Sequence, residues 1–333
     1  MQAISCAAPG RLELVDIAPP ALQPGWARVG IRHIGICGTD YHIFEGNFPF
    51  FEYPRVIGHE LSGTVLDPNG SGELKAGDPV VVNPYLSCGG CPACREGKTN
   101  CCETLRVIGV HAEGGMAEEI VMPHGNLYRA HGLSLRDAAM VEFLAIGAHA
   151  VRRAELQPGE RALVVGSGPI GLGVAYFARI AGADVTVIDA APDKIALTRT
   201  LGFRAFDTGE LEGDDFRATS GTGFDAVFDA TGSIRAMNAS IFHVRNGGSY
   251  TLVGLIKGDL VWPDAEVHRR ELTIRASRNA TRQDFEHVME SIRQGLVPTD
   301  SLATHTTSFD RVTVDMPNWV HSRDGLIKAI VTV

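Results

Sequence analysis

The chain has 333 residues, which is enough for two domains of the usual size, about 100–200 residues each. Hydrophobic residues make up 44% and charged residues 21%, as in ordinary globular proteins, and a net charge of -9 argues against a broad surface for nucleic acid. The sequence opens without a basic and apolar leader, and glycines and charges interrupt its most apolar stretch. We therefore expect a cytoplasmic protein that does not enter a membrane.

Two patterns of predicted secondary structure follow one another along the chain. Residues 1–150 carry short β-like runs separated by glycine and proline, among them RLELVDI, WARVGIRHIGI, ELSGTVL and PVVVNPY. Strands at such close spacing predict an antiparallel, barrel-like domain. From about Pro158 the pattern becomes strand, glycine turn, amphipathic helix, strand, as in ALVVG, PIGLGVAYFARIAG, DVTVIDA and PDKIALTRTLG, and later FDAVFDATG and GSYTLVG. This alternation predicts an α/β domain with a parallel sheet. One more helix-like stretch, RQDFEHVMESIRQG, precedes a closing strand, IKAIVTV.

Five of the seven cysteines fall between Cys88 and Cys102. In a chain without an export signal, such a cluster is more typical of a metal site than of disulfides. Cys88, Cys91 and Cys94 are spaced C-x-x-C-x-x-C, and four thiolates on a short loop can close a tetrahedron around zinc that leaves no position for substrate. The spacing therefore predicts a structural zinc, whose fourth ligand is either Cys101 or Cys102.

A G-x-G-x-x-G motif at Gly166, Gly168 and Gly171 lies between a predicted strand and a predicted helix. There the glycines permit a tight turn, close approach of a pyrophosphate and close helix–strand packing. Asp189 ends the next strand, where a carboxylate binds the ribose diol, and the two alanines after it offer no arginine for a 2′-phosphate. We therefore expect NAD. The predicted cofactor contacts are Gly166, Gly168, Pro169, Ile170, Gly171, Asp189, Gly254 and Leu255.

Three further polar residues stand beside β-like runs: Cys37 in GICGTDYH, His59 in GHE and Glu142 in VEFLA. Taken singly, each has an ordinary explanation, as a buried thiol, a core histidine or a surface carboxylate, and for a lone histidine or glutamate that explanation is the favoured one. Their occurrence together with a dinucleotide motif and a closed zinc lobe favours a functional interpretation.

The motifs GICGTD, GHE, the four-cysteine lobe, GVHAEGGMAEE, the glycine motif and IKAIVTV follow one another in this order. In this order and over essentially the whole chain, the sequence resembles the zinc-containing medium-chain dehydrogenases, in the branch of sorbitol, threonine and sugar-acid dehydrogenases. The resemblance implies a GroES-like, β-rich catalytic domain of residues 1–149 and 276–333. It implies a Rossmann NAD-binding domain, a doubly wound parallel sheet, of residues 150–275. It also implies two zinc ions per subunit and a homodimer or homotetramer.

The same resemblance implies ligands for a catalytic zinc. Cys37 and His59 would be two of them, and either Glu142 or Glu60 would be the third, with a fourth position open to substrate. Family members differ in which glutamate binds. We favour Glu142, although Phe143 stands where the family usually has proline.

Further roles follow from the resemblance. Asp40 would orient the ring of His59, and Cys102, not Cys101, would complete the structural zinc site. Thr39 and His42 would relay the proton of the alcohol to solvent, a task that suits histidine because it titrates near neutral pH.

Longer phrases are similar to bacterial dehydrogenases that act on L-galactonate, L-gulonate or L-idonate: YPRVIGHELSG, CPACREGKTNCCE, IGVHAEGG, AHAVRRAELQPGE, LIKGDL and ASRNATRQDF. This implies a small polyhydroxylated substrate, a six-carbon sugar acid oxidised at its fifth carbon to a keto acid. A neutral polyol such as sorbitol is the alternative. Arg278 and Asn279 are predicted to contact substrate, and Arg278 alternatively the cofactor, while a structural ion pair explains Arg278 equally well.

Two interpretations from other classes are weaker. A zinc-ribbon protein that binds nucleic acid would need basic residues in the cysteine lobe, yet Arg95 and Lys98 are balanced there by Glu96 and Glu103. A regulatory protein that binds NAD and zinc without catalysis would be expected to lack Cys37, His59 or Glu142, and all three are present.

Overall fold

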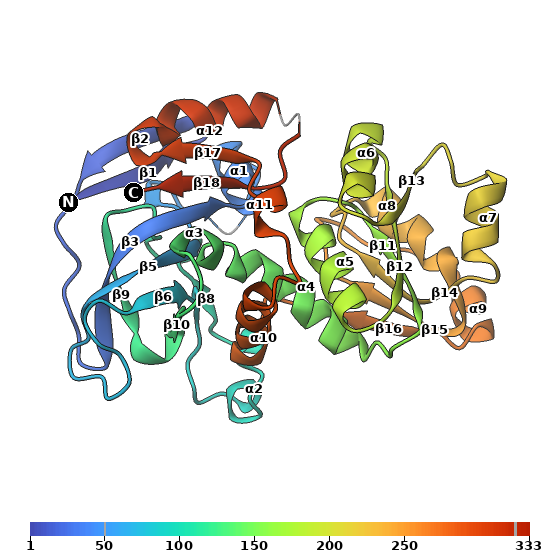
Figure 1. Cartoon of the computed structure of the whole chain (residues 1–333), viewed down its shortest axis with the longest axis horizontal. Coiled ribbons are helices and arrows are strands. Elements are labelled where there is room, and N and C mark those ends of the chain that lie inside the picture. Colours follow the sequence, from blue (N-terminus) through green and yellow to red (C-terminus); the bar gives the residue numbers. More distant parts are fainter. Residues whose placement is uncertain (50, 323–324) are drawn as a thin grey trace. The chain divides into compact units, whose positions relative to one another are not determined.

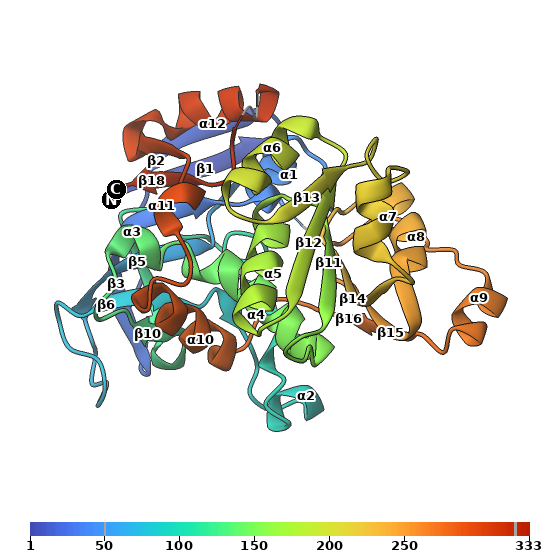
Figure 2. The ribbon, with the colours of Figure 1, turned by 45° about the vertical axis from the view of Figure 1, so that its right-hand side comes forward.

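The computed structural model describes residues 1–49, 51–322 and 325–333. It comprises two compact units, one made of residues 1–142 and 281–333, the other of residues 143–280 (Figures 1 and 2). The first unit is therefore assembled from both ends of the chain, as the resemblance implies. Its limits lie a few residues from the predicted ones, so that Arg278 and Asn279 belong to the second unit. No helix of the described residues is long and apolar enough to cross a membrane.

In the first unit all strand pairs within residues 1–150 are antiparallel, as predicted, and the later pair β17 and β18 is parallel. Its largest sheet has the order β10-β6-β5-β3-β18-β17, with β9 also paired to β3, so the last strand of the chain lies beside one of the first (Figure 1). The strands of this unit are β1 (Gln2–Ala8), β2 (Arg11–Asp16), β3 (Trp26–Ile36), β4 (Arg55–Val56), β5 (Glu60–Asp67), β6 (Pro79–Val82), β7 (Tyr85–Leu86), β8 (Arg106–Val107), β9 (Glu119–Pro123), β10 (Leu127–Arg129), β17 (His305–Ser308) and β18 (Ala329–Thr332).

Strand β3 leads directly to Cys37, one of the predicted zinc ligands. Val29 and Ile31 point their side chains into the core, and a bulge between Ile31 and His33 in the pairing with β5 shifts the alternation by one residue. Ile34 is consequently buried as well, and the strand ends at Ile36, directly before Cys37.

The helices of this unit are α1 (Gly38–Phe44), α2 (Pro92–Arg95), η1 (Thr99–Cys101), η2 (His124–Asn126), α3 (Leu135–Ala138), α10 (Arg282–Arg293), α11 (Thr299–Leu302), η4 (Phe309–Arg311) and α12 (Val312–His321).

The second unit contains one parallel sheet of order β13-β12-β11-β14-β15-β16. Its order reverses between β11 and β14, and this confirms the predicted doubly wound α/β fold, in which ligands bind beyond the carboxyl ends of the strands at the reversal. Its elements are α4 (Val141–Ala154), which begins in the first unit, β11 (Arg161–Val165), α5 (Pro169–Ile180), β12 (Asp184–Asp189), α6 (Pro192–Thr200), β13 (Arg204–Asp207), α7 (Asp214–Ser220), β14 (Phe224–Asp229), α8 (Ile234–Ser240), η3 (Ile241–His243), β15 (Val244–Leu252), α9 (Asp264–Arg269) and β16 (Thr273–Ala276).

Candidate active site and metal centres

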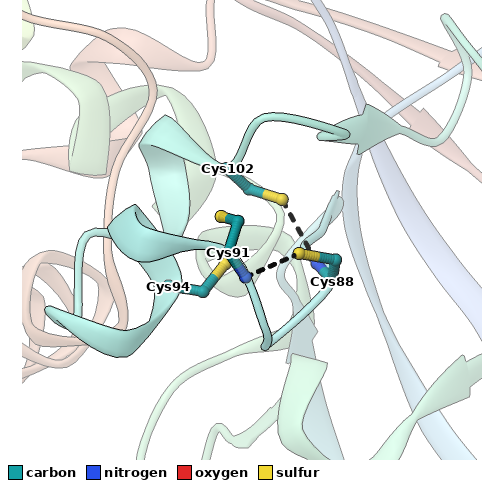
Figure 3. Close-up of side chains that lie close together, drawn as sticks. All are labelled: Cys88, Cys91, Cys94 and Cys102. Atoms are coloured by element: carbon teal, nitrogen blue, oxygen red, sulfur yellow. Dashed lines mark hydrogen bonds between the residues drawn. The ribbon is translucent and has the colours of Figure 1, made fainter.

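The structure gathers four cysteines of the lobe around one point. The sulfur atoms of Cys88, Cys91, Cys94 and Cys102 all lie within 4.8 Å of one another (Figure 3). Backbone N–H groups already point at two of these sulfurs, from Cys88 to Cys102 Sγ at 3.2 Å and from Cys91 to Cys88 Sγ at 3.3 Å. Cys101 is exposed and is not a member of this cluster.

The donors of this cluster fit a zinc ion. Backbone N–H groups of Gly90 and Cys91 lower the pKa of Cys88 to about 6, so that its thiolate is readily formed. Burial, followed by the hydrogen bond with the thiol of Cys91, raises the pKa of Cys94 to about 12. A dication at the centre would stabilise the charged form of these thiols, and four thiolates form the closed set of a structural zinc site.

A second cluster of possible ligands lies in the same unit. Atoms of Cys37, His59 and Glu60 all lie within 4.8 Å of one another. Cys37 follows β3 and caps α1, while His59 precedes β5 and Glu60 opens it. Because β3 and β5 pair antiparallel with Gly35 opposite Glu60, the end of one strand meets the start of the other. A side chain at Gly35 would collide with the Glu60 carboxylate, so only glycine fits there.

Asp40 is fully buried behind this cluster. Its carboxylate accepts hydrogen bonds from the backbone N–H groups of Cys37 at 2.9 Å and Gly58 at 3.3 Å. These bonds connect the two segments that carry the predicted ligands Cys37 and His59. Its Oδ1 lies 3.7 Å from His59 Nδ1, which is beyond hydrogen-bond distance, and that nitrogen has no hydrogen-bond partner among the described residues. Burial lowers the pKa of His59, but Asp40 and Cys37 outweigh it and raise the pKa well above the usual value. The anionic surroundings thus demand a cation, which suits a metal ion.

Lys328 also belongs to this cluster, although no motif in the sequence marks it as functional. It is buried, directly before β18, and its Nζ donates to both oxygens of Glu60 at 2.6 and 2.7 Å and to the carbonyl of Ile36 at 3.2 Å. The signal that could have found it is a lysine within the otherwise apolar run IKAIVTV. A buried lysine needs a charged partner, and Glu60 supplies it.

Glu142, the other predicted glutamate ligand, is buried at the start of α4 and is not a member of the three-residue cluster. Its Oε1 accepts a hydrogen bond from the hydroxyl of Tyr85, while its Oε2 is buried without a hydrogen-bond partner among the described residues. Burial raises the pKa of Glu142 to about 7, against the opposing charge of His59. Both glutamates therefore stay candidates for the third zinc ligand. Glu60 is a candidate because it lies within 4.8 Å of Cys37 and His59, and Glu142 because its Oε2 has no hydrogen-bond partner among the described residues.

The predicted proton relay lies on α1. Thr39 is half-buried in the first turn, and His42 follows one turn later with 57% of its side chain exposed. His42 Nδ1 lies 3.4 Å from Glu45 Oε2. An exposed histidine at this place is what the outer end of a relay needs, and the relay itself stays a prediction.

The glycine motif forms the turn between β11 and α5. Gly166 has a φ of +95°, and a side chain at Gly171 would collide with the carbonyl of Gly166, so both positions require glycine. Gly168 caps α5, a twelve-residue helix whose first N–H groups are available to an anion. Pro169 and Ile170 form its first turn and are partly exposed. The turn thus has the shape of a phosphate cradle.

Asp189 lies at the carboxyl end of β12, beside this turn. Its Oδ2 accepts from the backbone N–H of Ser167 at 2.7 Å and from its hydroxyl at 3.0 Å, and its Oδ1 accepts from the N–H of Ala191 at 3.0 Å. Gly254 follows β15 at the same end of the sheet and donates its N–H to the carbonyl of Asp229 at 2.8 Å. Leu255 next to it is 77% exposed. The arrangement fits a dinucleotide, with Asp189 at the position that meets the adenosine ribose.

Arg278 and Asn279 follow β16. Arg278 is exposed, whereas Asn279 is half-buried with a φ of +51°, a conformation that asparagine tolerates better than most residues. The side-chain nitrogen of Asn279 is buried without a hydrogen-bond partner among the described residues. Their assignment to the substrate stays a prediction.

Family models match both parts of the chain. Residues 23–132 match the alcohol dehydrogenase GroES-like domain and residues 169–294 match the zinc-binding dehydrogenase family. Over the whole chain and 99% of the relative, the sequence is 41% identical to L-galactonate-5-dehydrogenase of Escherichia coli K12.

Solved structures share the fold over the full chain. The rspB alcohol dehydrogenase of E. coli CFT073, in complex with NADH, has a TM-score of 0.93 at 28% identity and covers 100% of this chain and 99% of its own. A zinc-binding dehydrogenase of Sinorhizobium meliloti 1021, bound to NADP, has a TM-score of 0.89 at 26% identity, with the same shares covered. Proteins of this fold therefore bind either dinucleotide.

Proposed function

We propose that this chain, which belongs to the zinc-binding alcohol dehydrogenase family, oxidises a secondary hydroxyl of a six-carbon sugar acid with NAD as the hydride acceptor. The expected substrates are L-galactonate and L-gulonate, oxidised at the fifth carbon to a keto acid. The observation that carries the proposal is the 41% identity to L-galactonate-5-dehydrogenase along the whole chain. A cytoplasmic location and a homodimer or homotetramer remain predictions.

Residues of the first unit would bind both zinc ions and transfer the proton. Cys37 and His59 would hold the catalytic zinc with Glu60 or Glu142, while Cys88, Cys91, Cys94 and Cys102 would hold the structural zinc. Zinc at the first site supplies a Lewis acid that lowers the pKa of a bound alcohol, and NAD accepts the hydride. Asp40 keeps the two ligand loops together through its bonds to Cys37 and Gly58. Thr39 and His42 would carry the released proton outward.

One observation favours a neutral polyol as the second candidate. Lys328, the cation of the cluster, already has both oxygens of Glu60 as partners and offers no free charge to a substrate carboxylate. The two candidates separate when NADH formation is measured with purified protein on hexonates and on polyols. The sugar-acid proposal expects a higher kcat/KM on L-galactonate or L-gulonate, and a preference for sorbitol would refute it.

The cofactor preference should depend on Asp189. Its carboxylate is held by Ser167 and would repel a 2′-phosphate, so the wild type should use NAD far better than NADP. Asp189→Ala should raise the KM for NAD about tenfold or more, which is the loss expected for hydrogen bonds to a charged group. It should also reduce the difference in kcat/KM between NAD and NADP. The measurement is kcat/KM with each cofactor.

The matched control is Asp207→Ala, which removes a carboxylate from the end of the neighbouring strand β13, where it accepts from the N–H of Gly209 at 2.7 Å. This control should leave the ratio of the two efficiencies unchanged. Equal efficiency of the wild type with NAD and NADP would contradict the assignment.

Arg278 is proposed to hold the substrate carboxylate, with Asn279 beside it. A planar guanidinium can bind a carboxylate through two parallel hydrogen bonds, which would fix the carbon that is oxidised. Arg278→Ala should therefore lower kcat/KM on the sugar acid by about 10- to 100-fold, and that on sorbitol much less.

Arg275→Ala is the control, because Arg275 lies three residues earlier on β16 and pairs with Glu155 at 3.0 Å. Arg275→Ala should leave the ratio of kcat/KM on the sugar acid to kcat/KM on sorbitol unchanged. If Arg278→Ala lowers both activities equally, then Arg278 serves the cofactor or the fold and not the carboxylate.

A further inference from the structure

A buried tyrosine contacts the metal site from a strand that no sequence motif marks. Tyr85 lies on β7, is 6% exposed, and donates its hydroxyl to Oε1 of Glu142. The other oxygen of that carboxylate, Oε2, is buried and has no hydrogen-bond partner among the described residues. An unsatisfied buried carboxylate oxygen is costly, so this atom points to a ligand that completes it.

The charged groups that act on Glu142 belong to, or contact, the cluster of Cys37, His59 and Glu60. His59 and Lys328 lower the pKa of Glu142 and Glu60 raises it, while burial is the largest influence. The Tyr85 hydroxyl donates to Oε1 of Glu142, so Oε2 is the oxygen left for a further partner.

The two glutamates near the cluster are held in different ways. Both oxygens of Glu60 accept hydrogen bonds from Lys328 Nζ, so this carboxylate is already satisfied by the protein. Glu142 has one oxygen tied to Tyr85 and one left open. Because its carboxyl group can turn about its side-chain bonds, the bond to Tyr85 decides which oxygen is presented and where it lies.

We propose that Tyr85 is a positioning residue of the catalytic metal centre, whose hydroxyl holds Glu142 so that Oε2 is an oxygen donor to the bound zinc. The inference rests on the proposed function, since it requires zinc at Cys37 and His59. Partners that orient a ligand in this way typically contribute 10- to 100-fold to metal affinity or activity.

Tyr85→Phe tests the proposal by removing one hydroxyl while it keeps the ring. The variant should lose the catalytic zinc at a chelator concentration about tenfold lower than the wild type, and the structural zinc at the same concentration. In the cobalt-substituted protein, the visible absorption of the one-thiolate site should shift. The kcat should fall, and the KM for NAD should stay the same.

Tyr128→Phe is the matched control. Tyr128 is also buried, also packs edge-to-face on Phe285, and also loses one buried hydrogen bond, in its case from Asn83 at 2.8 Å. The melting temperatures of the two zinc-free variants should be similar, whereas only Tyr85→Phe should change the metal readouts.

A double-mutant cycle completes the test. Adding Tyr85→Phe to Glu142→Gln should cause no further loss of zinc affinity if the tyrosine acts through that carboxylate. The proposal is overturned if Tyr85→Phe binds zinc and cobalt like the wild type, or if it changes them only as much as Tyr128→Phe does. A wild type with one zinc per chain would instead refute the proposed function.

Discussion

Replacing His59 with alanine should abolish alcohol oxidation and release one of the two proposed zinc ions. The imidazole is one of three donors that lie within 4.8 Å of one another, and its loss leaves the metal with a thiolate and a carboxylate. The Lewis acid contributes several kcal/mol to catalysis, and at 1.36 kcal/mol per factor of ten, kcat should fall by at least about a thousandfold. The measurements are NADH formation and zinc per chain.

The fold should survive this substitution. The pairing of β3 with β5 that brings the ligands together involves backbone hydrogen bonds that do not depend on the imidazole. His33→Ala is the control, because His33 is a second histidine of the same unit, lies on β3, and is not a member of the metal cluster. It should retain both zinc ions and its activity. Two zinc ions and normal turnover in His59→Ala would exclude the proposed catalytic site.

Cys88→Ser should release the other zinc ion and lower the melting temperature. Metal binding contributes about 10–16 kcal/mol to the folding of zinc-finger peptides. Even about a quarter of that, roughly 3 kcal/mol, would lower the Tm of the first unit, residues 1–142 and 281–333, by about 6–12 °C, at the 2–4 °C per kcal/mol typical of domains of 150–250 residues. Thermal unfolding followed by circular dichroism, together with zinc analysis, checks this.

Cys101→Ser provides a closely matched control for the lobe. Cys101 is exposed, lies next to Cys102 in the sequence, and is not a member of the four-sulfur cluster. Its substitution should leave both zinc ions and Tm unchanged. If Cys101→Ser and Cys88→Ser have the same effect, then the lobe does not hold zinc through the four cysteines named here. If neither variant alters zinc content, the lobe carries no metal.

The features that the sequence determined by itself are local. Cys88, Cys91 and Cys94 lie within one short loop, so their spacing alone predicts a common metal, and the structure brings their sulfurs together with that of Cys102. The same holds for the turn at Gly166, where the order of strand, turn and helix dictates the backbone shape. Alternation of strands and helices likewise predicted the parallel sheet of the second unit, because each strand is followed by the helix that covers it.

The group of possible ligands around His59 could not be predicted from spacing, because separate segments of the chain contribute Cys37, the pair His59 and Glu60, and Lys328. The pairing of β3 with β5 joins Cys37 to His59 and Glu60, and the insertion of β18 beside β3 adds Lys328, 268 residues from its partner Glu60. The resemblance to known dehydrogenases suggested Cys37, His59 and Glu60 but not Lys328, whose only signal in the sequence is its charge within an apolar run.

Tertiary structure alone decided how each buried carboxylate near this cluster is held. The sequence does not distinguish Glu60 from Glu142. In the structure, Lys328 pairs with both oxygens of Glu60, whereas Tyr85 binds only one oxygen of Glu142. The difference arises because a buried charged group must find its partner in the space around it. That partner comes from whichever strand the fold places there, and sequence spacing does not encode it.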